Sequence, residues 1–307
     1  MQAIAGGADS VQYFQWRQSR GAFEKFHGAV VTHNGSEHTR VFQDVTQVGA
    51  RLADLAHIKN TETKARVAII FDWDNLRGLD EQKSLRNVNR DFEQVIMEHY
   101  EAVIQNYVSV DVIAQTADFS RYKVIIAPML YMFLPGTADK IRIFIKNGGT
   151  FIITFYSGMV NENDLAFECF PPFALNDVFG IKAEETDSLE DSDENSFNWE
   201  GKTYKVKRYC DLVQLYGAEV MAVYEQDFYA GLPVLTKNEY GSGMAYYMAA
   251  RSDVDFLRDF YARVLCDTEI SQIVKSEYVK DGMVKERCDK EKQYVFLMNF
   301  SRDSREI

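Results

Sequence analysis

The middle of this chain is predicted to fold as an α/β domain with a doubly wound parallel sheet. Three continuous apolar runs stand at residues 66–73, 122–130 and 150–156, a pattern typical of parallel strands buried on both faces. Stretches with the apolar spacing of helices, at 89–106 and 137–147, separate these runs. Strands that alternate with helices favour right-handed crossovers, and therefore helices on both faces of one sheet. This domain is expected to cover residues 63–270.

A single strand–loop–helix unit is predicted ahead of this domain, over residues 1–62. Residues 10–16, SVQYFQW, alternate and are rich in aromatic side chains, which predicts a buried strand. A polar loop follows, and residues 39–58 then carry an apolar stripe at helical spacing, made of Val41, Val45, Val48, Leu52 and Leu55. One such unit cannot bury both of its faces, so it is expected to need neighbours that the printed sequence does not supply.

The second half of the middle domain departs from the strand–helix alternation. The acidic stretch at 184–195 predicts a solvated loop, and residues 199–209 predict an antiparallel hairpin. A second hairpin, with a Gly-Ser-Gly turn, is expected at 233–249. Residues 252–267 predict the closing helix, with Ser252 as its N-cap.

The last segment, residues 271–307, is predicted to begin a small β-domain. Apolar and polar residues alternate over 277–288 and 293–300, with a Lys-Asp-Gly turn at 280–282. A β-sandwich needs more strands than two or three. This part is therefore expected to be incomplete.

Composition limits the classes of partner. The formal net charge of −12 argues against nucleic acid and anionic membrane surfaces as partners.

No apolar run reaches the roughly 18 residues of a membrane span and no signal-peptide pattern opens the chain, so a cytoplasmic protein is expected. Phosphate-binding glycine motifs and C-x-x-C pairs are missing from the sequence, so no cofactor and no metal are expected. Free thiols are expected at the four cysteines, Cys169, Cys210, Cys266 and Cys288.

The densest set of chemically useful side chains lies at residues 12–27. In α/β barrels, the loops after the carboxyl ends of strands build the active site. A carbohydrate site needs an aromatic platform for the apolar sugar face, and carboxylate and imidazole groups for the hydroxyls. Trp16, Glu24 and His27 supply those types, with Arg17, Arg20 and Lys25 nearby. The residue types alone leave a second interpretation open, a polar surface loop beside a buried tryptophan.

The run from Gly7 to Gly35 closely resembles the final βα unit of the catalytic barrel in β-galactosidases of glycoside hydrolase family 42. The order of parts agrees with that family along essentially the whole chain: a helix that closes the (β/α)8 barrel, a flavodoxin-like middle domain, and a small C-terminal β-domain. The resemblance is strongest in the first 60 residues. In the family the middle domain mediates trimer formation, so the resemblance implies a homotrimer.

The resemblance also implies roles for four residues. Glu24 and His27 match the family's E-x-x-H after the eighth strand, and are expected to hold hydroxyls of bound galactose. Trp16 and Phe23 are expected near the pocket wall. Family members hydrolyse terminal β-D-galactose with retention, using an acid/base and a nucleophile glutamate about 5–5.5 Å apart. The resemblance places both glutamates on barrel strands upstream of the matched run, so this chain is expected to hold no catalytic residue.

The sequence gives little support to two other possible catalytic sites. A retaining mechanism at Glu24 needs a facing carboxylate, and only Asp9 and Glu37 are near in sequence. The middle domain resembles the class I glutamine amidotransferases in fold class, and those need a cysteine nucleophile with a histidine partner. The corresponding bend holds Ser157, and all histidines precede residue 100: His27, His33, His38, His57 and His99. The middle domain is therefore expected to be a scaffold without catalysis.

Two functions from different classes remain open. The first is the assembly and substrate-contact portion of a β-galactosidase. The second is a non-catalytic, flavodoxin-like module that binds a sugar or a protein. An active amidotransferase-like hydrolase fails, because the cysteine and the late histidine are missing from the sequence.

Overall fold

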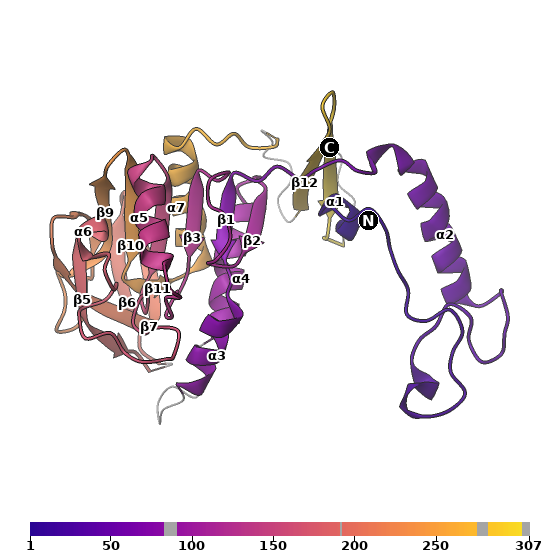
Figure 1. Cartoon of the computed structure of the whole chain (residues 1–307), viewed down its shortest axis with the longest axis horizontal. Coiled ribbons are helices and arrows are strands. Elements are labelled where there is room, and N and C mark those ends of the chain that lie inside the picture. Colours follow the sequence, from indigo (N-terminus) through magenta and orange to yellow (C-terminus); the bar gives the residue numbers. More distant parts are fainter. Residues whose placement is uncertain (83–90, 191, 275–281, 303–307) are drawn as a thin grey trace. The chain divides into compact units, whose positions relative to one another are not determined.

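The computed structural model describes residues 1–82, 91–190, 192–274 and 282–302. The chain divides into two compact units, one formed by residues 65–276 and one that joins residues 1–64 to residues 277–307 (Figure 1). The three-part division expected from the sequence, 1–62, 63–270 and 271–307, stays a prediction.

The larger unit is built on a seven-stranded sheet of order β2-β1-β3-β4-β10-β9-β8. The first five strands in that order are parallel neighbours, while β9 and β8 add antiparallel pairs at one side. The predicted apolar runs form strands whose side chains are buried, which confirms a mixed α/β fold. The strands are β1 Val67–Ile70, β2 Val110–Ile113, β3 Val124–Ala127, β4 Thr150–Thr154, β8 Glu219–Val223, β9 Pro233–Tyr240 and β10 Gly243–Met248.

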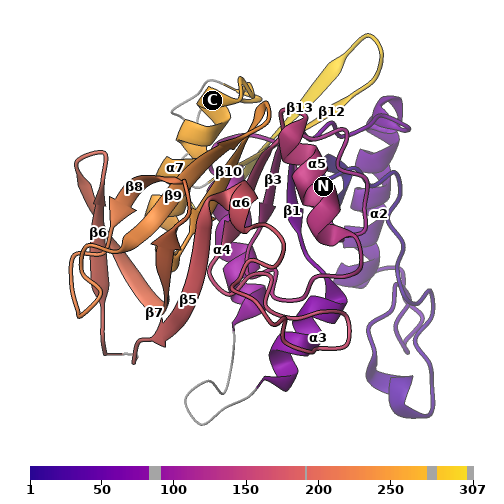
Figure 2. The ribbon, with the colours of Figure 1, turned by 60° about the vertical axis from the view of Figure 1, so that its left-hand side comes forward.

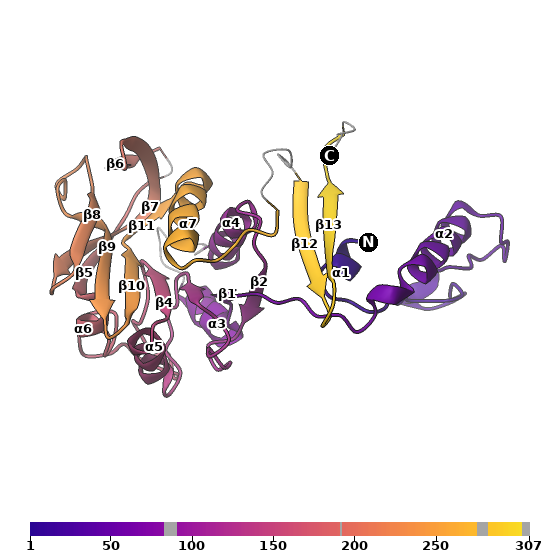
Figure 3. The same cartoon turned by 90° about the horizontal axis from the view of Figure 1, so that it is seen from above.

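Helices cover both faces of this sheet. α4 and α7 pack together on one face, and α5 lies on the opposite face (Figure 3). The sequence pattern does not predict α3, a short helix that Asp72 caps by accepting hydrogen bonds from the backbone of Asp74 and Asn75. The helices are α3 Trp73–Glu81, α4 Phe92–Ile104, α5 Thr137–Lys146, α6 Asn176–Phe179 and α7 Val254–Asp267.

A second sheet of four strands lies at one side of the larger unit, with the long strand β7 at its centre (Figure 2). The predicted hairpin at 199–209 is confirmed by the pairing of β6 with β7. The predicted loop at 184–195 is wrong in its first part, since residues 184–188 belong to β5. Pairing with β7 supplies hydrogen bonds to that backbone, while Glu184 and Glu185 point to solvent. The strands are β5 Ile181–Ser188, β6 Asn195–Trp199, β7 Lys202–Leu215 and β11 Ala250–Ser252.

Two local predictions in this unit have different outcomes. The hairpin at 233–249 is confirmed as β9 and β10, and a Cβ on Gly243 would stand 2.1 Å from the carbonyl oxygen of Ile145, so the Gly-Ser-Gly turn has a steric reason. The N-cap of α7 is Asp253, not Ser252. The Asp253 carboxylate accepts from the backbone N–H of Phe256 at 2.8 Å, while Ser252 ends β11.

In the smaller unit the predicted helix is present, whereas the predicted strand is not. Helix α2 spans Arg40–Asp54 with Thr39 as its N-cap. Residues 10–16 form no strand, and Tyr13 and Phe14 are exposed. A strand needs hydrogen-bonded neighbours, and in this stretch the structure provides only one isolated bridge nearby, between Arg17 and Val31. The other elements are α1 Gln2–Ala5, η1 Phe23–Phe26, η2 Ala56–Ile58, β12 Gly282–Cys288 and β13 Gln293–Asn299.

The terminal hairpin pairs β12 with β13 in antiparallel register. Its turn is at 289–292, where the Asp289 carboxylate accepts from the backbone of Glu291 and Lys292. The predicted Lys-Asp-Gly turn begins at residues 280 and 281, which lie outside the described residues. Over the described parts of the chain, no helix is long and apolar enough to cross a membrane.

His99 makes the larger unit sensitive to acid. Its ring is buried on α4 and shares a hydrogen bond with the Tyr261 hydroxyl. Burial, reinforced by the charge of Arg251, lowers the pKa of His99 from 6.5 to about 3. The unfolded chain therefore binds a proton first as the pH falls. The stability that neutral His99 contributes is present above pH 6.5, and it is lost progressively as the pH falls from 6.5 to about 3.

We expect the free energy of unfolding of the larger unit to fall by up to about 1.4 kcal/mol for each pH unit below the normal histidine pKa. Urea unfolding at about pH 7.5 and about pH 5.5 measures this slope. A Trp16→Phe background leaves Trp73 and Trp199 to report on the larger unit. His99→Gln, which keeps a partner for Tyr261, should flatten the slope. Equal slopes in both proteins would contradict the assignment.

Candidate functional site

The predicted sugar-contact loop contains one short 3-10 helix, η1, at Phe23–Phe26. It follows Ala22, which adopts a positive φ of 59°, and it ends at His27. The carbonyl oxygen of Glu24 accepts from the backbone N–H of His27 at 3.0 Å. Glu24 and His27 are therefore the first and last residues of one hydrogen-bonded 3-10 turn, and the backbone becomes extended at His27.

Backbone hydrogen bonds close this loop at its base. The carbonyl oxygen of Trp16 accepts from the backbone N–H of Val31 at 2.7 Å, and the N–H of Gln18 donates to the Val31 carbonyl at 2.9 Å. The Gln18 side chain adds a bond from its amide nitrogen to the His27 carbonyl at 3.0 Å. The ends of the loop are thus held together, and Gln18 links its base to the end of η1.

The aromatic side chains of the loop differ in their surroundings. Phe23 is fully exposed, while Trp16 is 66% exposed and places its ring edge-on to Phe42 of α2, at 6.3 Å between centroids. Among the described residues, neither the Glu24 carboxylate nor the His27 ring forms a hydrogen bond or an ion pair. Phe23, Glu24 and His27 therefore share one turn, and Trp16 contacts the helix instead. Their roles in binding galactose stay predictions.

The groups that a hydrolase would need in the larger unit are occupied by packing. Ser157, at the bend after β4, is buried, and its hydroxyl oxygen accepts from the backbone N–H of Leu130 at 3.1 Å. His99 lies on α4 and contacts Tyr261. Burial raises the pKa of the Cys210 thiol to about 12, which keeps it protonated. These groups serve the fold and do not form a nucleophile–base pair.

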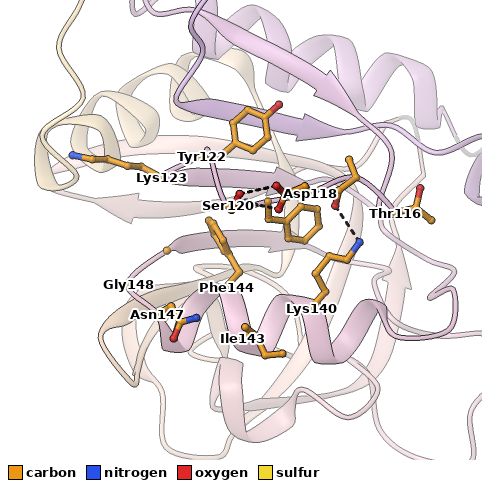
Figure 4. A pocket seen from close by; sticks show the side chains of 13 residues that line it. Thr116, Asp118, Ser120, Tyr122, Lys123, Lys140, Ile143, Phe144, Asn147 and Gly148 are labelled. Carbon is orange, nitrogen blue, oxygen red and sulfur yellow. Dashed lines mark hydrogen bonds between the residues drawn. The ribbon is translucent and has the colours of Figure 1, made fainter.

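A cavity of about 670 Å³ opens between α5 and the segment that follows β2 (Figure 4). Its charged groups are already engaged. The Lys140 ammonium donates to the backbone carbonyls of Gln115 and Ala117 at 3.0 and 3.1 Å. The Asp118 carboxylate accepts from the hydroxyl and the backbone of Ser120. The polar groups of this cavity hold its own loop, so it is a poor candidate site.

Two buried charged residues escape sequence analysis. Asp211 on β7 is 2% exposed and Arg287 on β12 is fully buried. Each stands in an alternating stretch as an ordinary charged residue, and its partners lie far away in sequence. The local pattern therefore gives no signal for either. Asp211 joins two sheets of the larger unit, and Arg287 joins the two ends of residues 10–57 in the smaller unit.

Two family models and several curated proteins match this chain, and together the matches cover nearly all of it. The family described as "Beta-galactosidase trimerisation domain" matches residues 65–271, and the family described as "Beta-galactosidase" matches residues 1–55. Beta-galactosidase Pbg of Clostridium perfringens is 43% identical over an alignment that covers 100% of this chain and 46% of that protein. Beta-galactosidase GanA of Bacillus subtilis is 39% identical, covering 99% of this chain and 45% of that protein.

Solved structures give the same result. The β-galactosidase from Rahnella sp. R3 is 41% identical with a TM-score of 0.93, over 98% of this chain and 46% of that one. The β-galactosidase from Bacillus circulans sp. alkalophilus is 38% identical with a TM-score of 0.90, over 97% of this chain and 45% of that one. The chain spans less than half the length of these relatives. It belongs to the β-galactosidases of glycoside hydrolase family 42 and corresponds to a C-terminal portion of them.

Proposed function

We propose that this chain is the assembly and galactose-contact portion of a retaining β-galactosidase, and that it contributes neither catalytic glutamate. The observation that carries the proposal is the succession of two family matches along one chain, β-galactosidase over residues 1–55 and trimerisation domain over residues 65–271. In the intact enzyme the reaction is hydrolysis of terminal β-D-galactose. The cytoplasmic location stays a prediction from the sequence.

The chemistry of η1 supports a role in sugar contact. A carboxylate accepts hydrogen bonds from hydroxyls, and an imidazole both donates and accepts. Glu24 and His27 offer these two groups from one turn, and neither is engaged elsewhere among the described residues. Phe23 and Trp16 add exposed aromatic faces on which the apolar side of a galactose ring can lie.

The surroundings of Asp9 support the absence of catalysis. A retaining mechanism needs two carboxyl groups about 5–5.5 Å apart. The Asp9 carboxylate is held by Arg287 at 2.6 Å and by the backbone N–H of Asn60 at 3.2 Å. The Arg287 guanidinium and that backbone bond hold the pKa of Asp9 below its usual value, so this carboxylate is an anionic structural partner.

The larger unit supports a role in assembly. The order of its first parallel strands, β2-β1-β3-β4, agrees with the flavodoxin-like arrangement that we propose for it. Its bend residue and its buried histidine are occupied by packing, which leaves a scaffold. We propose that this scaffold carries the contacts of a homotrimer.

Two measurements on the purified chain test the proposal. Light scattering should give three times the chain mass of 35.3 kDa at micromolar concentration. Galactose titration followed by NMR should shift the amides of η1, and Glu24→Gln should weaken binding by about tenfold or more, as for a lost hydrogen bond to a charged group.

Glu37→Gln is the matched control, since it removes an exposed carboxylate from the same unit and should leave galactose binding unchanged. A monomer would contradict the assembly role. Galactose binding that is insensitive to Glu24→Gln would contradict the site, and would favour a sugar-binding module that uses another surface.

A further inference from the structure

Arg287 in the terminal hairpin is fully buried, and its guanidinium is surrounded by acceptors. Its side chain has 0% exposure, although β12 belongs to a sheet of only two strands. The acceptors are Thr61 Oγ1 at 2.8 Å, Ile4 O at 3.0 Å, Ala8 O at 2.8 Å, Asp9 Oδ1 at 2.6 Å and Thr61 O at 2.9 Å.

A buried arginine costs stability unless its charge is paired and its N–H groups are satisfied. Here all three guanidinium nitrogens donate, and one carboxylate neutralises the charge. Lysine cannot reproduce this arrangement, because its ammonium is a single point and lacks the planar fork. The contacts therefore require arginine at position 287, and they fix all acceptors relative to β12.

The acceptors belong to two segments that flank residues 10–57, the stretch that contains the sugar-contact loop and α2. Ile4, Ala8 and Asp9 come just before residues 10–57, and Thr61 comes just after them. Further bonds tie the same two segments to each other and to the hairpin. The Asp9 carboxylate accepts from Asn60 at 3.2 Å, and Glu62 exchanges two backbone hydrogen bonds with Cys288 at 2.8 Å each.

We propose that Arg287 is a positioning residue: it holds the two ends of residues 10–57 together and thereby sets the placement of the loop that carries Glu24 and His27. The role of that loop rests on the proposed function, whereas the clamp itself does not. Closing a long loop costs chain entropy, and the hydrogen bonds of Arg287 offset that cost at the point where the ends meet. The terminal hairpin is thus part of the support of the sugar-contact loop.

Hydrogen exchange measured by mass spectrometry on the full chain tests this inference. In Arg287→Gln we expect the amides of residues 2–9 and 58–62 to exchange about tenfold faster or more, because these segments lose their shared partner. The amides that close the loop base, those of Gln18 and Val31, should also exchange faster. Peptides from residues 65–274 should be unchanged.

Arg40→Gln is the matched control: it makes the same charge change in the same unit, at a side chain that is 80% exposed on α2. Its exchange pattern should equal that of the wild type. Arg287→Lys should be intermediate, because the charge stays while the fork is lost. Asp9→Asn keeps the arginine and should also make the amides of the same two segments exchange faster. This variant can replace Arg287→Gln in the test if Arg287→Gln does not fold.

Two results would overturn the inference. One is faster exchange confined to residues 282–299, which would make Arg287 a local residue of the hairpin. The other is equally faster exchange in both units. A failure of the wild-type chain to bind galactose would contradict the proposed function. The role of Arg287 would still be decided by the hydrogen-exchange result.

Discussion

Asp211→Ala is expected to destabilise the larger unit by about 3–5 kcal/mol. The carboxylate is buried and accepts hydrogen bonds from the Tyr247 hydroxyl at 2.5 Å, the Thr186 hydroxyl at 2.6 Å and the backbone N–H of Tyr156 at 3.1 Å. Alanine leaves three buried donors without an acceptor and opens a cavity. Burial raises the pKa of Asp211, while the bonds from Thr186 and Tyr247 oppose that rise.

The position of Asp211 explains why the effect should be large. It lies on β7 of the four-stranded sheet, whereas Tyr247 lies on β10 and Tyr156 follows β4, both in the seven-stranded sheet. Its carboxylate therefore joins the two sheets of the unit. Urea unfolding measures the loss of stability, and Asp193→Ala, which removes an exposed carboxylate, should change it by less than about 0.5 kcal/mol. A loss below about 1 kcal/mol in Asp211→Ala would show that other contacts join the sheets.

The same region bears on the proposal that the larger unit is a scaffold, because related open sheets often bind ligands there. In open α/β sheets, ligands bind beyond the carboxyl ends of the parallel strands. Here aromatic rings stack just beyond that edge. Tyr156 stacks on Tyr131 at 5.6 Å between centroids, and Tyr209 stacks on Phe155 at 5.2 Å. Packing of this kind stabilises the junction of the sheets.

The apolar runs predict the strands of the larger unit because both faces of those strands are buried. β1, β3 and β4 are each buried along their full length. The same reasoning fails at residues 10–16, where the side-chain pattern of a strand is present but the backbone has no neighbouring strands to pair with. It also fails at residues 184–188, since an acidic composition does not exclude an edge strand whose charges face solvent.

The candidate site is predictable only in part, for a related reason. Glu24 lies in η1 and His27 directly follows it, but the roles of both residues in binding galactose stay predictions. The roles of Arg287 and Asp211 depend on partners brought close by the fold. Arg287 meets Thr61 across 226 positions of the chain, and no local pattern contains that information. Long-range polar contacts of this kind become visible only with the fold.

We also expect that the chain does not hydrolyse β-galactosides on its own. Glycosidic hydrolysis with retention needs an acid/base and a nucleophile, and enzymes accelerate such reactions by about a millionfold or far more. We propose that Glu24 binds a sugar hydroxyl, and the Asp9 carboxylate is held by Arg287. Without the two glutamates of the barrel, nearly all of that acceleration should be missing.

Release of nitrophenol from a nitrophenyl β-galactoside by the purified chain measures this activity. The expected rate equals that of buffer, and it should be the same for the wild-type chain and for Glu24→Gln. A trace of contaminating enzyme would give a rate that Glu24→Gln leaves unchanged. Robust turnover that Glu24→Gln abolishes would contradict the prediction, because the hydrolysis would then belong to this chain and not to a contaminant.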